Sequence, residues 1–284
     1  MIDPRIKFIE KDPHTINRKD KNDHRILQYY LNLIDLDNKI YIDIGCSTNP
    51  QTPLPYIFDA DHCIFFECDP EKIQIWRTGG PRLPDGKRAF QKLLQLPNFA
   101  LITKKVTPYN IGEIIENIIG RKDPKFVDID IDGYDYYVLR SILESHKPSL
   151  IMAEINEKIP PPIKFTVNYD SNWCYDGSHF YGMSLSKFCE LAEEYSYDVI
   201  NLSFNNVFAV HKNKNPGLQT FKDAELYEAF YRSLRLNPTG VHNASIFNHN
   251  ENMDHLLLMP PGDALDELNR IFEPKYRDKY SAYI

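Results

Sequence analysis

An alternation of acidic and apolar residues at 126–132 constrains the fold more than any other feature of the sequence. Asp128, Asp130 and Asp132 are separated by single isoleucines. Side chains of a β-strand point to opposite faces in turn, so the pattern predicts a strand over 126–131 with all three carboxylates on one face. Such a row needs hydrogen-bond donors, opposite charge, a cation or exposure at a strand end. We therefore expect a functional site at the carboxyl end of this strand, with Asp128 lying deeper and structural.

Apolar segments of strand length alternate with amphipathic helical segments over residues 39–211. Strands joined by helical crossovers predict a mainly parallel sheet with helices on both faces. Two further strands with a tight turn at Asn205-Asn206 predict an antiparallel hairpin at one edge, which gives an α/β fold with seven strands. The expected strands are 39–44, 64–67, 98–106, 126–131, 149–155, 198–204 and 206–211, and the expected helices are 71–77, 87–96, 111–119, 134–144 and 184–195.

The chain divides into three segments by pattern. Residues 1–38 are a charged arm followed by a helix from Asp23, and residues 39–211 form the sheet domain. Within this domain, residues 156–182 contain Pro160-Pro161-Pro162 and several aromatic residues, and their length predicts a lid-like insertion. Residues 212–284 form a helical extension, with helices expected at 223–234 and 263–272. This extension is a candidate cap, a candidate oligomer contact or a part of the substrate pocket, and the sequence leaves these roles open.

Composition and charge are those of a soluble globular protein. The 284 residues are 42% hydrophobic and 26% charged, with a formal net charge of -7. The acidic balance argues against non-specific binding to nucleic acid or to an anionic membrane. No signal segment and no run of about 18 apolar residues is evident, so we expect no membrane partner and a cytoplasmic location. The five cysteines lack metal-finger spacing and are expected to be free thiols.

The turns after the first two expected strands have the layout of a nucleotide-binding site. Asp43-x-Gly45 follows the first strand, and Glu67, 22 residues after Gly45, ends the second. Glycine lets a ligand approach the backbone, and the acid can accept hydrogen bonds from ribose hydroxyls. The loop from Gly45 to Pro50 has one glycine and so lacks a pyrophosphate cradle, which S-adenosylmethionine does not need. The alternative is a glycine turn beside a surface acid.

Five segments within residues 39–211 form a recognisable set: 42–45 (IDIG), 66–70 (FECDP), 106–111 (VTPYNI), 126–135 (FVDIDIDGYD) and 153–156 (AEIN). Together they resemble the FkbM-like branch of class I S-adenosylmethionine-dependent methyltransferases. The resemblance implies a Rossmann-like fold and places the methionine part of the cofactor at Asp43 and Gly45. It also places the ribose at Glu67 and the adenine near Val106 and Thr107. Prolines at 53 and 55 depart from the family, in which a full helix follows the first strand.

Oxygen-bearing side chains are expected to meet at the carboxyl ends of two strands. Asp130 and Asp132 end one strand, while Glu154 and Asn156 share a face at the end of another. These four groups are candidate ligands for Mg²⁺ or Ca²⁺, and a bound cation would lower the pKa of an acceptor hydroxyl. Without a metal, Asp130 is the candidate general base. The alternative is an acidic row satisfied by backbone amides or by arginine and lysine.

The loop at 176–182 supplies a second candidate catalytic residue. His179 lies in this mobile-looking loop and is a candidate base or ligand, with a locally hydrogen-bonded surface histidine as the alternative. Trp173, Tyr175, Phe180 and Tyr181 could stack on a sugar, although packing within the loop is the favoured interpretation.

The sequence predicts transfer of a methyl group from S-adenosylmethionine to a hydroxyl of a sugar, a nucleotide-sugar or another small polar metabolite. Mg²⁺ is a candidate assistant. One alternative is a metal-dependent glycosyltransferase that holds a nucleotide-sugar through Asp130-x-Asp132, and another is a non-catalytic binding protein on the same fold. The position of Asp43-x-Gly45 and Glu67 ahead of the Asp pair favours methyl transfer.

Overall fold

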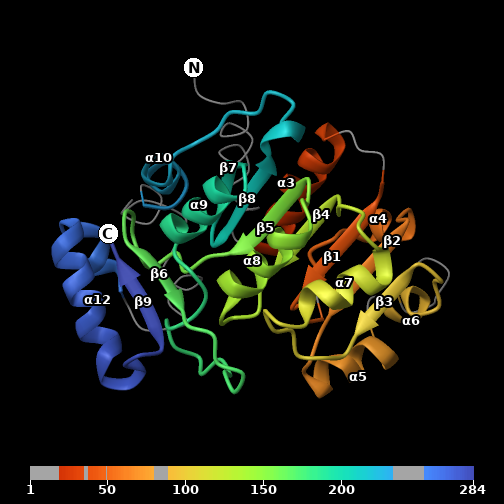
Figure 1. Ribbon diagram of the computed structural model, residues 1–284, viewed down its shortest axis with the longest axis horizontal. Helices are drawn as coiled ribbons and strands as arrows, with labels where there is room; N and C mark the ends of the chain where they lie inside the picture. Colours follow the sequence, from red (N-terminus) through yellow and green to blue (C-terminus); the bar gives the residue numbers. More distant parts are fainter. Residues whose placement is uncertain (1–18, 35–37, 49, 80–88, 233–252) are drawn as a thin grey trace. The chain divides into compact units, whose positions relative to one another are not determined.

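The computed structural model describes residues 19–34, 38–48, 50–79, 89–232 and 253–284 (Figure 1). The predicted turn at 238–240 and most of the N-terminal arm lie outside these residues. In the described part of the chain, no helix is both long and apolar enough to cross a membrane. All five cysteines are free thiols, as the sequence predicts.

A seven-stranded sheet forms the centre of the fold, in the order β3-β2-β1-β4-β5-β8-β7. β1 pairs in parallel with β2 and with β4, and β2 pairs in parallel with β3, whereas β7 and β8 pair in antiparallel fashion. This confirms the predicted α/β class, the mainly parallel sheet and the edge hairpin. The strands are β1 (Ile40–Ile44), β2 (His62–Phe66), β3 (Phe99–Ile102), β4 (Phe126–Ile129), β5 (Leu150–Glu154), β7 (Tyr197–Ser203) and β8 (Asn206–His211).

Local signals in the sequence set the ends of several helices. Asp69 caps α5 by accepting the backbone N–H groups of Glu71 and Lys72 at 2.8 and 3.3 Å. Gly120, with φ 65°, ends α7, because glycine adopts this conformation without a steric penalty. The helices are α3 (Lys19–Leu33), α4 (Leu54–Phe58), α5 (Pro70–Thr78), α6 (Ala89–Leu93), α7 (Ile111–Ile119), α8 (Asp135–Ser145), α9 (Leu185–Glu194), α10 (Asp223–Tyr227), with a π-helical turn at Glu228–Arg232, and α12 (Pro261–Tyr276).

The structure corrects several predicted boundaries. The helix expected from Asp23 begins at Lys19, and the hairpin turn falls at 204–205 rather than at Asn205-Asn206. β3 ends at Ile102 instead of residue 106, because the side chain of Asn110 bridges the following turn, donating to the carbonyl of Lys105 and accepting from the N–H of Thr107. β4 ends at Ile129, and Asp132 has φ 52°. The strand alternation therefore does not extend to Asp132, and the expected single face for all three aspartates is wrong.

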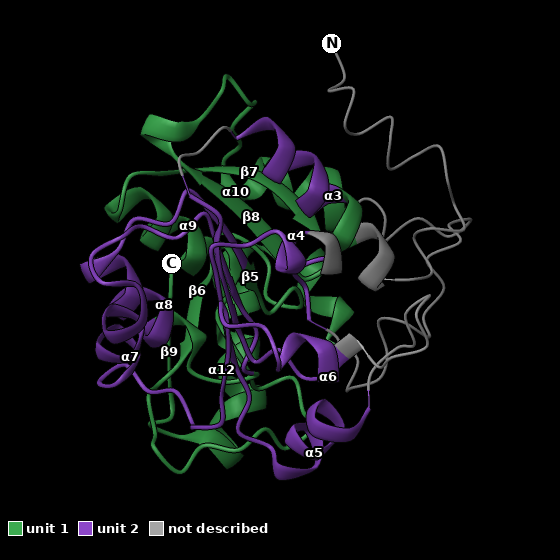
Figure 2. Ribbon diagram, turned by 90° about the vertical axis from the view of Figure 1, so that its right-hand side faces the viewer, with its two compact units in different colours: residues 1–25, 132–136, 153–284 green, residues 26–131, 137–152 purple. Residues whose placement is uncertain are grey.

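The chain forms two compact units, each discontinuous in sequence (Figure 2). Unit 2, drawn in purple, comprises residues 26–131 and 137–152. Within it, α7 and α8 lie on one side of the strands, and α4 and α6 lie on the other. Trp76 of α5 stacks on Phe90 of α6, with ring centroids 4.0 Å apart, and so joins these two helices. Unit 1, drawn in green, comprises residues 1–25, 132–136 and 153–284.

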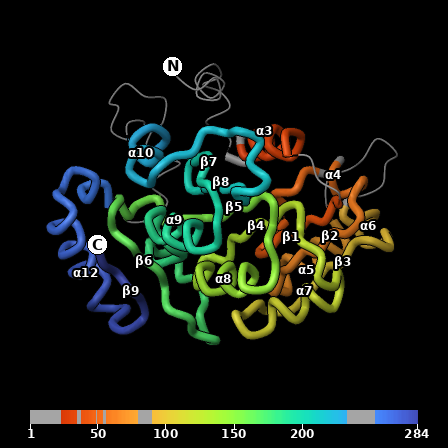
Figure 3. Tube along the Cα trace, turned by 45° about the horizontal axis from the view of Figure 1, so that its top comes forward, coloured from red at the N-terminus to blue at the C-terminus, as the bar shows by residue number. Residues whose placement is uncertain are grey.

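Unit 1 contains a small sheet that the sequence did not predict. β6 (Lys164–Val167) pairs with β9 (Tyr280–Tyr283), and Figure 3 shows the two strands side by side next to α12. The lid-like insertion and the C-terminal extension are thus packed together, and the described extension is not purely helical. They share one hydrophobic cluster, formed by Ile159, Ile163, Phe165, Val167, Phe180, Met253, Leu256, Ala264, Leu268, Phe272 and Tyr276.

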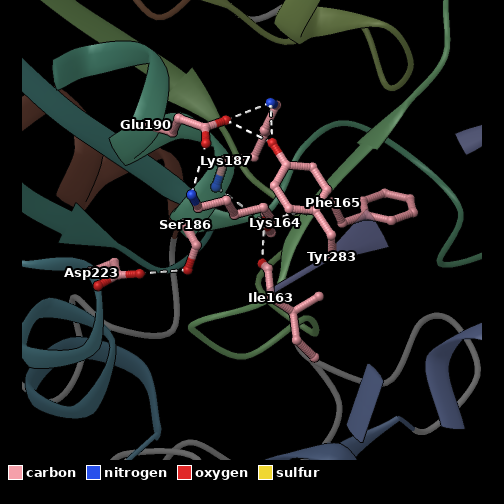
Figure 4. Close-up of polar contacts among 9 residues, drawn as sticks. Ile163, Lys164, Phe165, Ser186, Lys187, Glu190, Asp223 and Tyr283 are labelled. Carbon is pink, nitrogen blue, oxygen red and sulfur yellow. Dashed lines mark hydrogen bonds and ion pairs between the residues drawn. The ribbon is translucent and has the colours of Figure 1, made fainter. Parts of the chain in front are cut away.

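A charged network fastens the C-terminal strand to α9 (Figure 4). Glu190 accepts hydrogen bonds from Lys164 at 2.7 Å, from Lys187 at 2.5 Å and from the hydroxyl of Tyr283 at 3.0 Å. Lys187 also donates to Tyr283 at 2.9 Å. Burial alone would raise the pKa of Glu190, but these hydrogen bonds outweigh it and lower the pKa to about 2. The carboxylate form of Glu190 therefore stabilises the fold.

We expect Glu190→Gln to lower the free energy of unfolding by about 1 kcal/mol near neutral pH. Because the folded-state pKa is depressed, the stabilisation is present above the usual glutamate pKa of 4.5 and is lost as the pH falls towards 2. Urea unfolding at about pH 7 and about pH 3 should show a smaller difference in the free energy of unfolding between wild type and variant at the lower pH. Glu193→Gln is the control, since Glu193 is 84% exposed and 3.9 Å from Lys212. An equal decrease in the free energy of unfolding at both pH values would contradict the role assigned to the charge of Glu190.

Candidate active site

Asp43, on β1, is a fully buried carboxylate. Its Oδ2 accepts the backbone N–H of Gln51 at 2.9 Å, whereas its Oδ1 has no hydrogen-bond partner among the residues that the structure describes. Burial raises the pKa of Asp43 to about 7, and hydrogen bonds from the backbone of Gln51 and Thr52 offset only part of this effect. A buried carboxylate with one unused oxygen is suited to a cationic ligand.

Gly45 follows β1 and has φ 86°. A Cβ atom at this position would lie 1.8 Å from the backbone oxygen of Asp130, which is an impossible contact. The sequence interpretation, that glycine leaves room for a ligand, therefore misses the main reason for this residue. Gly45 is needed because the chain after β4 passes directly over it, with the N–H of Asp130 bound to the carbonyl of Ile44 at 2.9 Å.

Glu67 follows β2 and is 6% exposed, so the alternative of a surface acid is wrong. Its Oε1 accepts the N–H groups of Cys68 and Asp69, both at 2.8 Å. Its Oε2 lies 4.0 Å from Nζ of Lys72. Because these two backbone hydrogen bonds already hold the carboxylate in place, the side chain of Glu67 loses less conformational entropy when a ligand binds Oε2.

Val106 and Thr107 lie in the turn after β3, where the side chain of Asn110 holds the backbone. Val106 is buried. The N–H of Glu67 bonds the carbonyl of Ile102 at 3.1 Å, so the ends of β2 and β3 are joined. The predicted cofactor residues, all in unit 2, thus follow or end three neighbouring parallel strands, which is where sheets of this type bind ligands.

The predicted metal ligands are partly brought together. One carboxylate oxygen of Asp132 and one of Glu154 lie within 4.8 Å of each other. Asp132 is half-buried, and Glu154 is 7% exposed and accepts a hydrogen bond from the side chain of Asn205. Asp130, two residues before Asp132, is also half-buried, whereas Asp128 is 2% exposed, in line with its expected deeper position. Asn205 was recognised in the sequence only as a turn residue.

Asn156 does not share the orientation predicted for it. Its amide nitrogen donates to the carbonyl of His179 at 2.7 Å and to that of Tyr181 at 3.2 Å. Its amide oxygen accepts the N–H of Lys158 at 3.3 Å. The side chain is fully buried and used to hold the backbone of the 179–181 segment, because residue 156 lies beyond the end of β5 at Glu154 and strand alternation no longer applies.

His179 is 1% exposed, so the prediction of a mobile loop position is wrong. The loop is tied down on both sides of this residue. Ser178 hydrogen-bonds the hydroxyl of Tyr276 at 2.8 Å, and the ring of Phe180 stacks on that of Tyr276 with centroids 3.8 Å apart. Phe180 and Tyr181 are buried, which agrees with the favoured interpretation that they pack the loop.

A parallel sheet whose first strand ends in Asp43-x-Gly45 and whose second strand ends at a preorganised acid has the design of a class I methyltransferase. The chain belongs to the FkbM methyltransferase family, since residues 4–172, more than half of its length, match the family described as the methyltransferase FkbM domain. The family that the sequence resembles is thus confirmed. Among curated protein sequences there is no match.

Solved structures give weaker similarity. The C-terminal domain of precorrin-6Y C5,15-methyltransferase from Rhodobacter capsulatus is 13% identical, with 44% of this chain and 58% of that chain covered and a TM-score of 0.31. The chain thus spans less than two thirds of that domain. CalS10, an amino pentose methyltransferase from Micromonospora echinaspora solved with S-adenosylmethionine bound, is 8% identical, with 67% of this chain and 90% of that chain covered and a TM-score of 0.37. Similarities this low do not extend to activity or substrate.

Proposed function

We propose that this protein transfers a methyl group from S-adenosylmethionine to a hydroxyl of a sugar or another small polar acceptor. The observation that carries the cofactor half of the proposal is the buried Oδ1 of Asp43, which lacks a partner in the described part of the chain. The ammonium group of the methionine part would satisfy it. Glu67 would accept the ribose hydroxyls, and Val106 and Thr107 would lie near the adenine.

The acceptor half of the proposal rests on Asp130, Asp132 and Glu154. When bound, the cofactor supplies a methyl group activated by its sulfonium. Asp130 would take the proton of the acceptor hydroxyl as the new oxygen–carbon bond forms and the carbon–sulfur bond breaks. The three carboxylates are also suitable ligands for Mg²⁺, which would lower the pKa of that hydroxyl. Asn156 and His179 are proposed to support the site structurally instead, because both side chains are buried.

A small-molecule acceptor is favoured over nucleic acid by the net charge of -7. Cytoplasmic location and oligomer formation through residues 212–284 stay predictions from the sequence.

Calorimetric titration tests the proposal. S-adenosylhomocysteine should bind in the absence of metal, and UDP-glucose and GDP-mannose are titrated with and without Mg²⁺ for comparison. The nucleotide-sugars represent the rival glycosyltransferase, in which Asp130 and Asp132 would hold a diphosphate through the metal. Tight binding of a nucleotide-sugar without binding of S-adenosylhomocysteine would exclude methyl transfer.

The raised pKa of Asp43 gives a pH dependence that distinguishes its role. An ammonium group binds the ionised form, so cofactor binding should release protons near neutral pH. We expect the affinity for S-adenosylhomocysteine to rise from about pH 6 to about pH 8, with a limiting slope of about tenfold per pH unit below the pKa. Calorimetry in buffers of different ionisation enthalpy measures the released protons. Asp43→Asn should weaken binding and remove the proton release, whereas Asp59→Asn, at a 74% exposed side chain, should do neither. Proton release that persists in Asp43→Asn would contradict this role.

A further inference from the structure

A cavity in unit 1 is lined by residues that have no part in the proposed cofactor site. It has a volume of about 430 Å³, within the range of about 300–1,000 Å³ usual for small-molecule sites. We refer to it as the Trp173 pocket. It is lined by residues 168–171 and Trp173 of the insertion, and by Asp278 and Lys279 of the extension.

The pairing of β6 with β9 creates this pocket. Asn168 follows β6 and Lys279 precedes β9, and the N–H of Asn168 bonds the carbonyl of Lys279 at 2.8 Å. The side-chain amide of Asn168 donates to the carbonyl of Asp278 at 3.1 Å. Two segments more than 100 residues apart are thus fixed as opposite walls, because backbone bonds extend the small sheet by one residue.

Trp173 connects the pocket directly to the acidic residues of the proposed acceptor site. Its indole N–H donates to the backbone oxygen of Asp132 at 2.9 Å. The ring lies so close to the next residue that a Cβ atom on Gly133 would be 2.4 Å from it. A ligand in contact with Trp173 would therefore lie beside the Asp132–Gly133 turn.

The lining combines aromatic rings with short polar groups. Tyr169 and Trp173 are half-buried, and Tyr169 is held by an edge-to-face contact with Tyr134 at 4.9 Å. Asp170 and Asp278 supply carboxylates and Lys279 a single ammonium group. Aromatic rings can cover the apolar face of a ring with many hydroxyls, while carboxylates and amides accept and donate hydrogen bonds to those hydroxyls. The excess of one negative charge disfavours a phosphorylated ligand.

We propose that the Trp173 pocket is the acceptor subsite and that it binds a sugar ring that is uncharged or carries an amino group. The proposal rests on the proposed function, because it assigns the acceptor of the same reaction. It narrows that acceptor, since nucleotide-sugars and sugar phosphates carry the wrong charge for this lining. Tyr169 and Asp278 determine the specificity of the subsite.

Fluorine NMR can test the subsite separately from the cofactor site, because the chain contains two tryptophans. In protein labelled with 5-fluorotryptophan, Trp173 reports the pocket. Trp76 donates to the carbonyl of Ser47 at 2.5 Å and reports the loop after Gly45. The probes are methyl α-glucopyranoside, glucosamine and glucose 6-phosphate, each added in the presence of S-adenosylhomocysteine. We expect the first two to shift the Trp173 resonance saturably and to leave the Trp76 resonance in place, and the phosphate to bind more weakly.

Variants complete the test. Tyr169→Ala and Asp278→Asn should each lower the sugar affinity measured from the Trp173 resonance by about fivefold or more. Asparagine tolerates the φ of 63° at residue 278, so that substitution is not expected to disturb the backbone. Tyr175→Ala, on the same loop but outside the pocket, should leave the response unchanged.

The outcomes separate the two proposals. If calorimetry shows S-adenosylhomocysteine binding but neither neutral nor amino sugar shifts Trp173, the subsite is wrong and the proposed methyl transfer stands. If S-adenosylhomocysteine itself does not bind, the proposed function fails. The subsite would also be overturned if glucose 6-phosphate bound more tightly than the other two sugars. The same holds if Tyr175→Ala lowered the sugar affinity as much as Tyr169→Ala does.

Discussion

Asp130→Ala is expected to lower the rate of methyl transfer about 1,000-fold while leaving the affinity for S-adenosylhomocysteine unchanged. Loss of a positioned general base typically costs about 100- to 10,000-fold, and loss of a metal ligand acts on the same step. The backbone of Asp130, which bonds Ile44 and covers Gly45, is kept in the alanine variant, so the sheet should stay intact.

Single-turnover assays with labelled S-adenosylmethionine and an acceptor that the wild-type protein methylates would measure this rate. Asp59→Ala is the control, because its side chain is 74% exposed. Adding Mg²⁺ should accelerate the wild-type protein if the carboxylates hold a cation, and should not restore the variant. A variant with near wild-type turnover would remove Asp130 from the mechanism.

Gly45→Ala is expected to lower the free energy of unfolding by about 3 to 5 kcal/mol, or to prevent folding altogether. Alanine would have to adopt the left-handed backbone conformation of residue 45, and its Cβ would also collide with the backbone oxygen of Asp130. These two energetic costs add. The collision is with backbone, which cannot move aside as a flexible side chain could.

Gly177→Ala separates the two costs. Gly177 has φ 80°, close to the 86° of Gly45, but a Cβ there would meet nothing within 4 Å. Its substitution should therefore cost only the backbone term, about 1 to 2 kcal/mol. Urea unfolding of both variants gives the comparison, and an equal loss at the two positions would show that the contact with Asp130 is not what requires glycine at residue 45.

The positions of the proposed cofactor residues in the fold could be predicted from the sequence because they depend on local order along the chain. Asp43, Gly45 and Glu67 lie at the ends of parallel strands, and the carboxyl ends of such strands meet at one edge of a sheet whatever the details of packing. Helix α7 was predicted with its observed bounds, since Gly120 marks its end and its apolar residues recur at helical spacing.

The positions of the residues predicted for the acceptor side were harder to predict, because they depend on departures from regular structure. Strand alternation fails at Asp132, where the backbone turns to φ 52°, and at Asn156, which lies beyond β5. His179 looked exposed because its segment is rich in glycine and polar residues. The segment around it is held by contacts of Ser178 and Phe180 with Tyr276, which lies about 100 residues away and leaves no local signal.

The pairing of β6 with β9 is the largest feature that the sequence did not reveal. Both strands have four residues, too few for a clear periodic pattern, and their partners are more than 100 residues apart. This pairing makes the insertion and the extension two walls of one pocket. It also gives the C-terminal extension a direct part in the proposed acceptor site, one of the roles that the sequence left open.

The central claim is that cofactor and acceptor are held by different acids, and the affinity for S-adenosylhomocysteine in Glu67→Gln and Asp130→Ala tests it most directly. Glutamine keeps an oxygen for the N–H groups of Cys68 and Asp69 but replaces the second acceptor oxygen of Glu67. Calorimetric titration should show binding weakened about tenfold or more in Glu67→Gln and unchanged in Asp130→Ala. An equal loss of affinity in both variants would contradict the division of roles.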